Sequence, residues 1–153
     1  MGRKTPGRGL WLGLVLMMGM CVRAFATEAT LVADAHVNSA LPAVNSGAIS
    51  NINVGGGYTG LLQFDLGMLP AGTTSAQVTR AVLRVYVNRV DTAGSVSLQP
   101  LKGAWSEYGV TYSTLPGMGA AAQTFSVSQA GTFVAVDVTA LVQGWIAAPA
   151  TNH

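Results

Sequence analysis

The sequence predicts an all-β fold, an antiparallel β-sandwich of jelly-roll type with one short helical turn near the C-terminus. Several short segments alternate apolar and polar residues with a period of two, which is the pattern of half-buried strands. Gly, Pro, Asn and Asp recur between these segments at intervals of about ten residues, as they do in sandwich folds. Only one segment, near the end of the chain, has helical spacing.

The first 26 residues have the pattern of a secretory signal peptide. Basic residues open the segment, residues 10–22 form an uncharged apolar run, and Ala24-Phe25-Ala26 supplies an A-x-A cleavage site. At a rise of about 1.5 Å per residue this run reaches roughly 20 Å, short of the roughly 30 Å hydrocarbon core, so a membrane anchor is disfavoured. We therefore expect cleavage after Ala26 and a secreted, extracellular domain over residues 27–153, with no membrane span after cleavage.

Removing this segment reverses the charge of the chain. The whole sequence carries a net charge of +2, whereas residues 27–153 hold four Lys and Arg against six Asp and Glu, a net charge of −2. The four basic residues are scattered, which argues against nucleic acid as a partner and disfavours polyanions. The single Cys, Cys21, lies inside the predicted signal peptide, so the domain has no disulfide and no thiolate metal site. Its length suits one domain with its own core.

The first half of the domain contains three predicted strands separated by turns. Residues 29–37 alternate an apolar set with a set that includes Asp and His, which gives this strand an unusual polar face. Residues 41–50 hold Pro, Asn and Gly and form turns. Residues 52–54 are expected to be a short strand that stops at Gly55–Gly57. Residues 58–66 alternate again and are expected to be buried on one side.

The second half begins with the strand predicted over residues 80–90, whose apolar set points inward. Residues 91–94 are a candidate four-residue hairpin that leads into a strand over residues 95–101. Further strands are expected over residues 109–112, 123–127 and 132–138. Residues 139–146 are the only plausible helix, limited to two turns by Gly144, with Asp137 or Thr139 as its cap.

Four short blocks carry a family resemblance: GLLQFDL, AVLRVYV, GAWSEYGVTY and VDVTALVQGW, at residues 60–66, 81–87, 103–112 and 136–145. In this order they resemble the DNRLRE-domain family, which comprises disaggregatase-related or carbohydrate-binding-module-like domains of secreted bacterial and archaeal proteins. The resemblance implies a β-sandwich that binds rather than cuts, although a shared fold alone does not establish a shared reaction. It also implies one or two strands after the helix, so we expect a domain that lacks its last strand or strands, as a truncated reading frame or a piece of a longer secreted protein.

The common catalytic motifs are absent from the sequence, and no catalytic residue is predicted. A glycosidase would need two carboxylates at roughly 5 to 9 Å. The carboxylates available for such chemistry are Asp34, Asp65, Glu107 and Asp137. Two of them have a structural alternative, because Asp65 can close an Asx turn and Asp137 can cap the helix. A structural calcium ion is a further alternative, with Asp34 and Asp137 as ligands if the first and late strands are neighbours. No D-x-D-x-D loop supports this calcium site.

Aromatic residues decide whether a sugar site is plausible, because sugar rings stack on exposed aromatic faces while polar neighbours bond the hydroxyls. Tyr58 and Tyr108 each lie near Gly in loop-like segments, and a second group of candidates shares one face of the strand over residues 80–90. The candidate residues are Tyr58, Arg80, Arg84, Tyr86, Asn88 and Tyr108. An ordinary solvated strand face is the alternative. Trp105 is expected in the core, because Trp is highly buried on average.

The expected function is that of a secreted, non-catalytic module that binds a polysaccharide or cell-surface glycan as an accessory or cell-surface domain. One alternative is a structural or adhesive spacer of a larger surface protein, without a sugar site. A polysaccharide-degrading enzyme is the third possibility. Members of the resembling family that bind acidic polysaccharides such as alginate use several Lys and Arg residues, whereas this domain offers only four.

Overall fold

A computed structural model describes Met1 and residues 27–153, so residues 2–26 of the predicted signal peptide lie outside the described part of the chain. The strands are β1 (Thr30–Asn38), β2 (Tyr58–Asp65), β3 (Val82–Val87), β4 (Gly94–Leu98), β5 (Gln123–Val127) and β6 (Thr132–Asp137). One α-helix, α1 (Thr139–Ala147), follows β6 directly. The short 3-10 helices are η1 (Ser75–Gln77), η2 (Tyr112–Thr114) and η3 (Pro149–Thr151).

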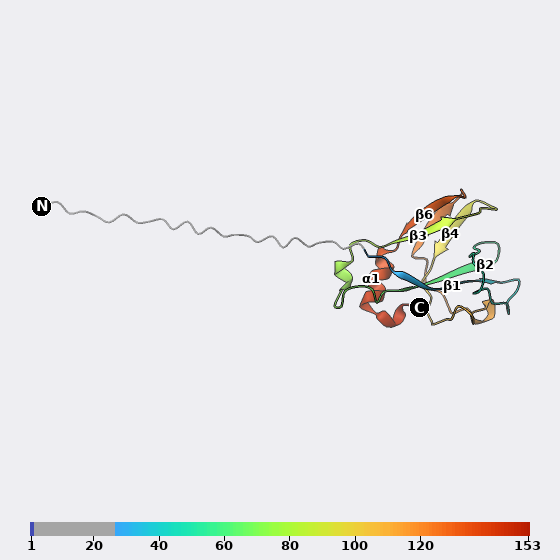
Figure 1. The fold of residues 1–153 in the computed structure, drawn as a ribbon, viewed down its shortest axis with the longest axis horizontal. Helices are drawn as coiled ribbons and strands as arrows, with labels where there is room; N and C mark the ends of the chain where they lie inside the picture. Colours follow the sequence, from blue (N-terminus) through green and yellow to red (C-terminus); the bar gives the residue numbers. More distant parts are fainter. Residues whose placement is uncertain (2–26) are drawn as a thin grey trace.

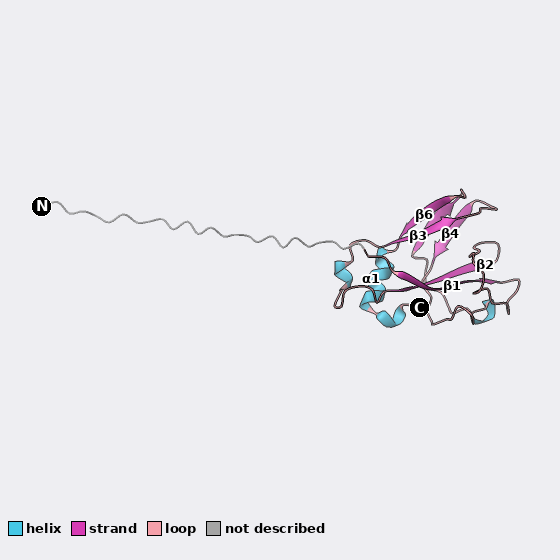
Figure 2. Ribbon diagram, viewed as in Figure 1, coloured by secondary structure: helices cyan, strands magenta, loops and turns pink. Residues whose placement is uncertain are grey.

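The strands form three two-stranded antiparallel sheets, β1–β2, β3–β6 and β4–β5. β5 also contacts β6, so the last two pairs lie side by side in one layer above β1–β2 (Figure 1). The helix α1 lies at one end of the two layers (Figure 2). Among the described residues, no helix combines the length and the apolar character that a membrane span requires. The predicted β-sandwich with one short helix is confirmed.

The core is centred on β1 and β2. Ala35, Val37 and Leu61 are buried, and Val110 joins them from a loop. Ala35 pairs directly with Leu61 across the sheet, which brings apolar side chains of both strands to one face. Trp105 packs against this cluster from outside the sheet, so its predicted place in the core is confirmed.

The polar face of β1 is covered as well. His36 is 3% exposed, and the edge of its ring meets Tyr58 at a centroid distance of 5.5 Å. Asn53 Nδ2 lies 3.4 Å from His36 Nε2. A side chain at Gly60 would collide with Ile52, whose Cγ2 lies 2.6 Å from the position of a Cβ atom. Residues 52–54 therefore pack on this face as an irregular segment, and the prediction of a strand there is wrong.

Two further predictions about the second half are wrong. Residues 91–94 do not form a hairpin, because β3 pairs with β6 and β4 with β5, so this turn connects two different sheets. Residues 109–112 are not a strand: Val110 is buried, and its N–H donates to the carbonyl of Ser106 within a local turn. Asn45 Nδ2 holds this loop by donating to the carbonyls of Glu107 and Val110, at 2.8 and 2.6 Å. The amide satisfies backbone groups that a sheet would otherwise satisfy.

The helix α1 begins where predicted. The N–H of Thr139 donates to Asp137 Oδ1 at 2.9 Å, so the carboxylate satisfies one of the free donors at the helix start. Thr139 Oγ1 accepts a bond from the N–H of Ala81 at 2.9 Å, and Gln143 Nε2 donates to the carbonyl of Val78 at 2.8 Å. These two bonds fix the helix to the segment that precedes β3. They thereby hold α1 beside η1 and the start of β3.

Candidate functional site

The outer face of the β3–β6 sheet carries the exposed side chains that the sequence predicted for β3. Along β3 the odd-numbered apolar residues are half-buried and the even-numbered ones are exposed, as the period of two requires. The opposite strand continues this face, because the register pairs Val82 with Asp137, Arg84 with Ala135 and Tyr86 with Phe133. All six of these side chains are exposed. The predicted inward direction of the apolar set is confirmed.

An aromatic pair lies at the far end of this face from the helix. Tyr86 and Phe133 are 54% and 56% exposed, and their rings meet edge to face at a centroid distance of 5.1 Å and an angle of 61°. The guanidinium of Arg84 lies 4.7 Å from the centre of the Phe133 ring. We call these three residues the aromatic patch. Edge-to-face rings and a cation above a ring are both attractive arrangements, so the patch is held in place without a ligand.

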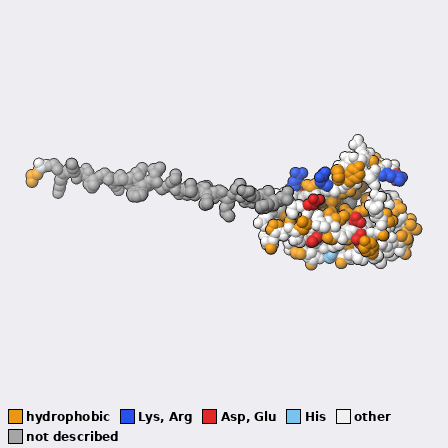
Figure 3. Space-filling view, in the orientation of Figure 1, with side chains coloured by type: hydrophobic (Ala, Val, Ile, Leu, Met, Phe, Trp, Pro, Cys, Tyr) orange, Lys and Arg blue, Asp and Glu red, His pale blue; other side chains and the backbone are white. Residues whose placement is uncertain are grey.

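The guanidinium of Arg84 is available for a ligand. Within residues 27–153 there is one ion pair, and Arg84 is not part of it. Arg89 Nε lies 2.6 Å from Asp91 Oδ1, and both of these side chains are exposed. Arg84 therefore keeps donors that no carboxylate of the described chain occupies. Figure 3 shows the Lys and Arg side chains of the visible face on the upper layer, with Asp and Glu side chains below them.

Asn88 and Arg80 lie beyond the two ends of β3. Asn88 Nδ2 donates to Asn51 Oδ1 at 2.8 Å, which joins the end of β3 nearer the aromatic patch to the segment covering β1–β2. At the other end, hydrogen bonds with Thr139 and then the positive charge of Arg80 lower the pKa of the Asp137 carboxyl. Asp137 thus has a structural role, but the predicted cap is wrong: Val138 is the N-cap of α1 and makes no side-chain cap bond, and Asp137 binds the N–H of Thr139 from one residue earlier. Asp65 closes the predicted Asx turn, since its Oδ1 accepts a bond from the N–H of Gly67 at 2.7 Å.

The two loop tyrosines lie apart from this face. Tyr58 starts β2, is half-buried, and contacts His36 of the neighbouring strand β1, so it belongs to the β1–β2 layer. Tyr108 is 74% exposed in the loop that carries Trp105 and Val110. Of the six residues proposed for a sugar site, the structure therefore places Arg84 and Tyr86 on β3, with Asn88 just beyond the end of that strand.

The residues proposed for calcium lie on different sheets. Asp34 is in β1 opposite Leu62, and Asp137 is at the end of β6 opposite Val82. The first and late strands are not hydrogen-bonded neighbours, which was the condition for bringing the two carboxylates together. In the part of the chain that the structure describes, no group of three or more His, Cys, Asp and Glu could hold a metal ion. Calcium stays a prediction, which thermal unfolding in CaCl₂ and in EDTA would test.

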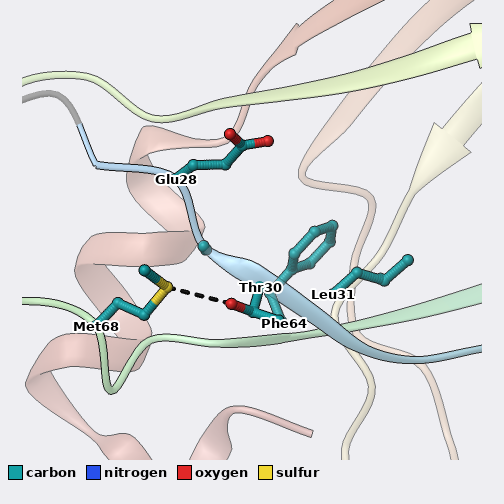
Figure 4. Close-up of a pocket in the computed structure, with 6 residues that line it drawn as sticks. Glu28, Thr30, Leu31, Phe64 and Met68 are labelled. Carbon is teal, nitrogen blue, oxygen red and sulfur yellow. Dashed lines mark hydrogen bonds between the residues drawn. The ribbon is translucent and has the colours of Figure 1, made fainter.

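A groove of about 450 Å³ lies elsewhere, at the start of β1. Figure 4 shows Leu31 and Phe64 on one side of this groove and the bond from the Thr30 hydroxyl to the Met68 sulfur, at 3.2 Å, on the other. Its lining is mainly apolar and its charged residue is Glu28. A hydroxyl-rich sugar finds few bonding partners there, so the face with the aromatic patch is the better candidate.

The sequence analysis missed Phe133, the residue that completes the aromatic patch. The signal for it was present, because residues 132–138 alternate, and Phe133 stands on the same face of its strand as Ala135 and Asp137. Asn51 was not among the residues predicted for a sugar site. Its bond to Asn88 joins residues 37 positions apart, and no local pattern indicates it.

Comparison with protein families gives a match to the model of carbohydrate-binding module family 96, over residues 26–152. Comparison with curated proteins gives no match. The family match spans the whole described sandwich, including both strands that carry the aromatic patch. The chain belongs to carbohydrate-binding module family 96.

Proposed function

We propose that this chain is a secreted, non-catalytic DNRLRE-type module that binds a polysaccharide or cell-surface glycan through the outer face of β3 and β6. The observation that carries the proposal is the aromatic patch, two half-exposed rings with a guanidinium above one of them that forms no ion pair within residues 27–153. The family match supports carbohydrate as the ligand class. The module would act as an accessory or cell-surface domain, within a larger secreted protein.

The chemistry of the aromatic patch suits a sugar ring. The C–H face of a pyranose is apolar and packs against an aromatic ring, while the ring's hydroxyls need hydrogen bonds around the edge. Tyr86 supplies a ring and a phenol, and Arg84 supplies guanidinium donors beside Phe133. Asn88 and Asn51 add amide groups at the rim. One stacking surface with donors and acceptors on its border is thus present on a single sheet.

The fixed pairing of β3 with β6 supports binding as well. Scattered exposed apolar residues are normal on protein surfaces and need no function. Here the two rings pair directly across a sheet whose inner face is half-buried, so their positions are set by the register. Side chains that are ordered before binding lose less conformational entropy when the ligand arrives.

Electrophoresis of residues 27–153 through gels cast with polysaccharides tests the proposal. We expect retardation of the native protein, and loss of retardation in Phe133→Ala and Tyr86→Ala. Tyr108→Ala is the matched control, because it removes a more exposed aromatic ring that lies off this face. Migration unaffected by every polysaccharide would contradict the proposal and favour a structural or adhesive spacer.

A separate assay tests the non-catalytic part of the proposal. We expect no release of reducing sugar from any polysaccharide that retards the protein. Should release occur, Glu107→Gln shows whether Glu107 takes part. The backbone carbonyl of Glu107 already holds Asn45, so a folded variant must be verified by circular dichroism.

A further inference from the structure

A row of four hydroxyl groups occupies the outer face of the neighbouring β4–β5 sheet. The register pairs Ser95 with Ser126 and Ser97 with Thr124, and all four side chains are exposed. The hydroxyls of Ser97 and Thr124 lie 3.3 Å apart. We call these four residues the hydroxyl stripe. Each hydroxyl offers one donor and two acceptor positions, as the hydroxyl of a sugar does.

The direction of the hydroxyl stripe is fixed by the apolar residues between its members. Val96 and Leu98 of β4, and Phe125 and Val127 of β5, are half-buried. A slip of one residue in the register would expose these apolar side chains and bury the hydroxyls, so the arrangement is strongly specified.

The hydroxyl stripe and the aromatic patch belong to the same layer. β5 contacts β6, and Figure 2 shows both strand pairs on the same side of β1–β2. With strands about 4.8 Å apart, a path from β3 across β6 and β5 to β4 covers at least roughly 14 Å. This width accommodates more than one sugar ring, so a ligand that stacks on the patch can extend onto the stripe.

The charges of this combined face favour a neutral ligand. The aromatic patch has the positive charge of Arg84, the same sheet face ends in the carboxylate of Asp137, and the hydroxyl stripe has no charge. The domain over residues 27–153 has a net charge of −2, and Arg89 is already bound to Asp91. A polyuronate, with a carboxylate on each sugar, would meet the guanidinium of Arg84 on this face, because the charge of Arg80 already acts on the carboxylate of Asp137.

We infer that the outer layer binds an extended neutral polysaccharide, which stacks on the aromatic patch and bonds the hydroxyl stripe of β4–β5. This inference rests on the proposed function and adds its substrate class and a second strand pair. The chain of the ligand crosses the strands, from Tyr86 towards Ser97.

Affinity electrophoresis with four polymers tests the inference: mixed-linkage β-glucan and xylan as neutral probes, and polygalacturonate and alginate as polyuronates. We expect retardation by a neutral polymer. The double variant Ser97→Ala/Thr124→Val removes two hydroxyls with little change of shape, and we expect about tenfold weaker binding from two lost hydrogen bonds. Ser128→Ala, an exposed serine between β5 and β6, is the matched control and should bind as the native protein does.

The outcomes separate this inference from the proposed function. Retardation by polyuronates alone would overturn the inference and leave the proposed function standing. Neutral binding with native affinity in the double variant would overturn the role of the hydroxyl stripe. Absence of retardation by all four polymers would contradict both.

Discussion

The guanidinium carbon of Arg84 lies 4.7 Å from the ring centre of Phe133, although the register sets Arg84 opposite Ala135 and Phe133 opposite Tyr86. The arginine thus reaches diagonally across the sheet, a distance that long side chains can span. The contact joins β3 and β6, which are far apart in the sequence, and it lies on the exposed face of their sheet.

This contact should contribute measurably to stability. We expect Phe133→Leu and Arg84→Gln to show a coupling of about 0.5–1 kcal/mol in the free energy of unfolding, the usual size of an exposed cation–π pair. A double-mutant cycle followed by urea unfolding measures it. Additive effects of the two substitutions would show that the cation and the ring do not interact in solution.

The turn at Asp137 should make stability depend on pH. The pKa of Asp137 is below its ordinary value of 3.8 because of the bonds with Thr139 and the charge of Arg80. A depressed pKa stabilises the fold above the unfolded value, and this contribution is lost as pH falls through the lower folded value. The melting temperature should therefore fall as pH drops below about 4, and Asp137→Asn should reduce this fall.

Glu28→Gln is the control for that series, since Glu28 is exposed and lies outside α1 and β6. Melting temperatures of the native protein, Asp137→Asn and Glu28→Gln, measured between neutral and acidic pH, test this prediction. If the melting temperatures of all three proteins depend equally on pH, Asp137 does not cause the loss of stability in acid.

Gly47 should not tolerate a side chain. A Cβ atom at this buried position would collide with the carbonyl group of Glu107, which Asn45 also binds. We expect Gly47→Ala to destabilise the domain by about 1–3 kcal/mol, as overpacking does. Gly144→Ala is the contrasting variant, because nothing lies within 4 Å of its Cβ position in α1. There we expect a gain of about 0.5–1 kcal/mol, and chemical denaturation measures both.

Export should remove the first 26 residues. The mature protein, recovered outside the cell after expression with its own N-terminus, should begin at Thr27 by N-terminal sequencing. Ala26→Gln should impair processing, because the cleavage site requires a small residue there. A mature protein that still begins at Met1 would contradict the signal-peptide prediction.

The strands that could be predicted from sequence are those whose own residues alternate. β5 was predicted with its observed bounds, and β3, β6 and α1 to within a few residues, because burial on one face leaves a local period. The strand predicted over residues 109–112 is absent, because Val110 is buried in a loop that is held by Asn45, 65 residues earlier in the sequence. A local pattern reports that a residue is buried and not what buries it.

Strand pairing could not be predicted for a related reason. The turn over residues 91–94 has hairpin chemistry, yet it leads from one sheet to another. The same limit applied to the candidate site: Arg84 and Tyr86 were recognised on one strand, whereas Phe133 becomes their neighbour only through the pairing of β3 with β6. Which strands pair depends on the packing of the whole chain, which no short window contains.

The pairing of β3 with β6 also sets the moment at which the proposed binding surface comes into being. β3 leaves the ribosome well before β6, with β4 and β5 between them, and the proposed export would pass the strands in the same order. Until β6 arrives, Arg84 and Tyr86 have no facing ring and no partner strand. A nascent chain held in the export channel would therefore be unable to adhere to glycans, and this ability would appear only once the end of the domain has crossed.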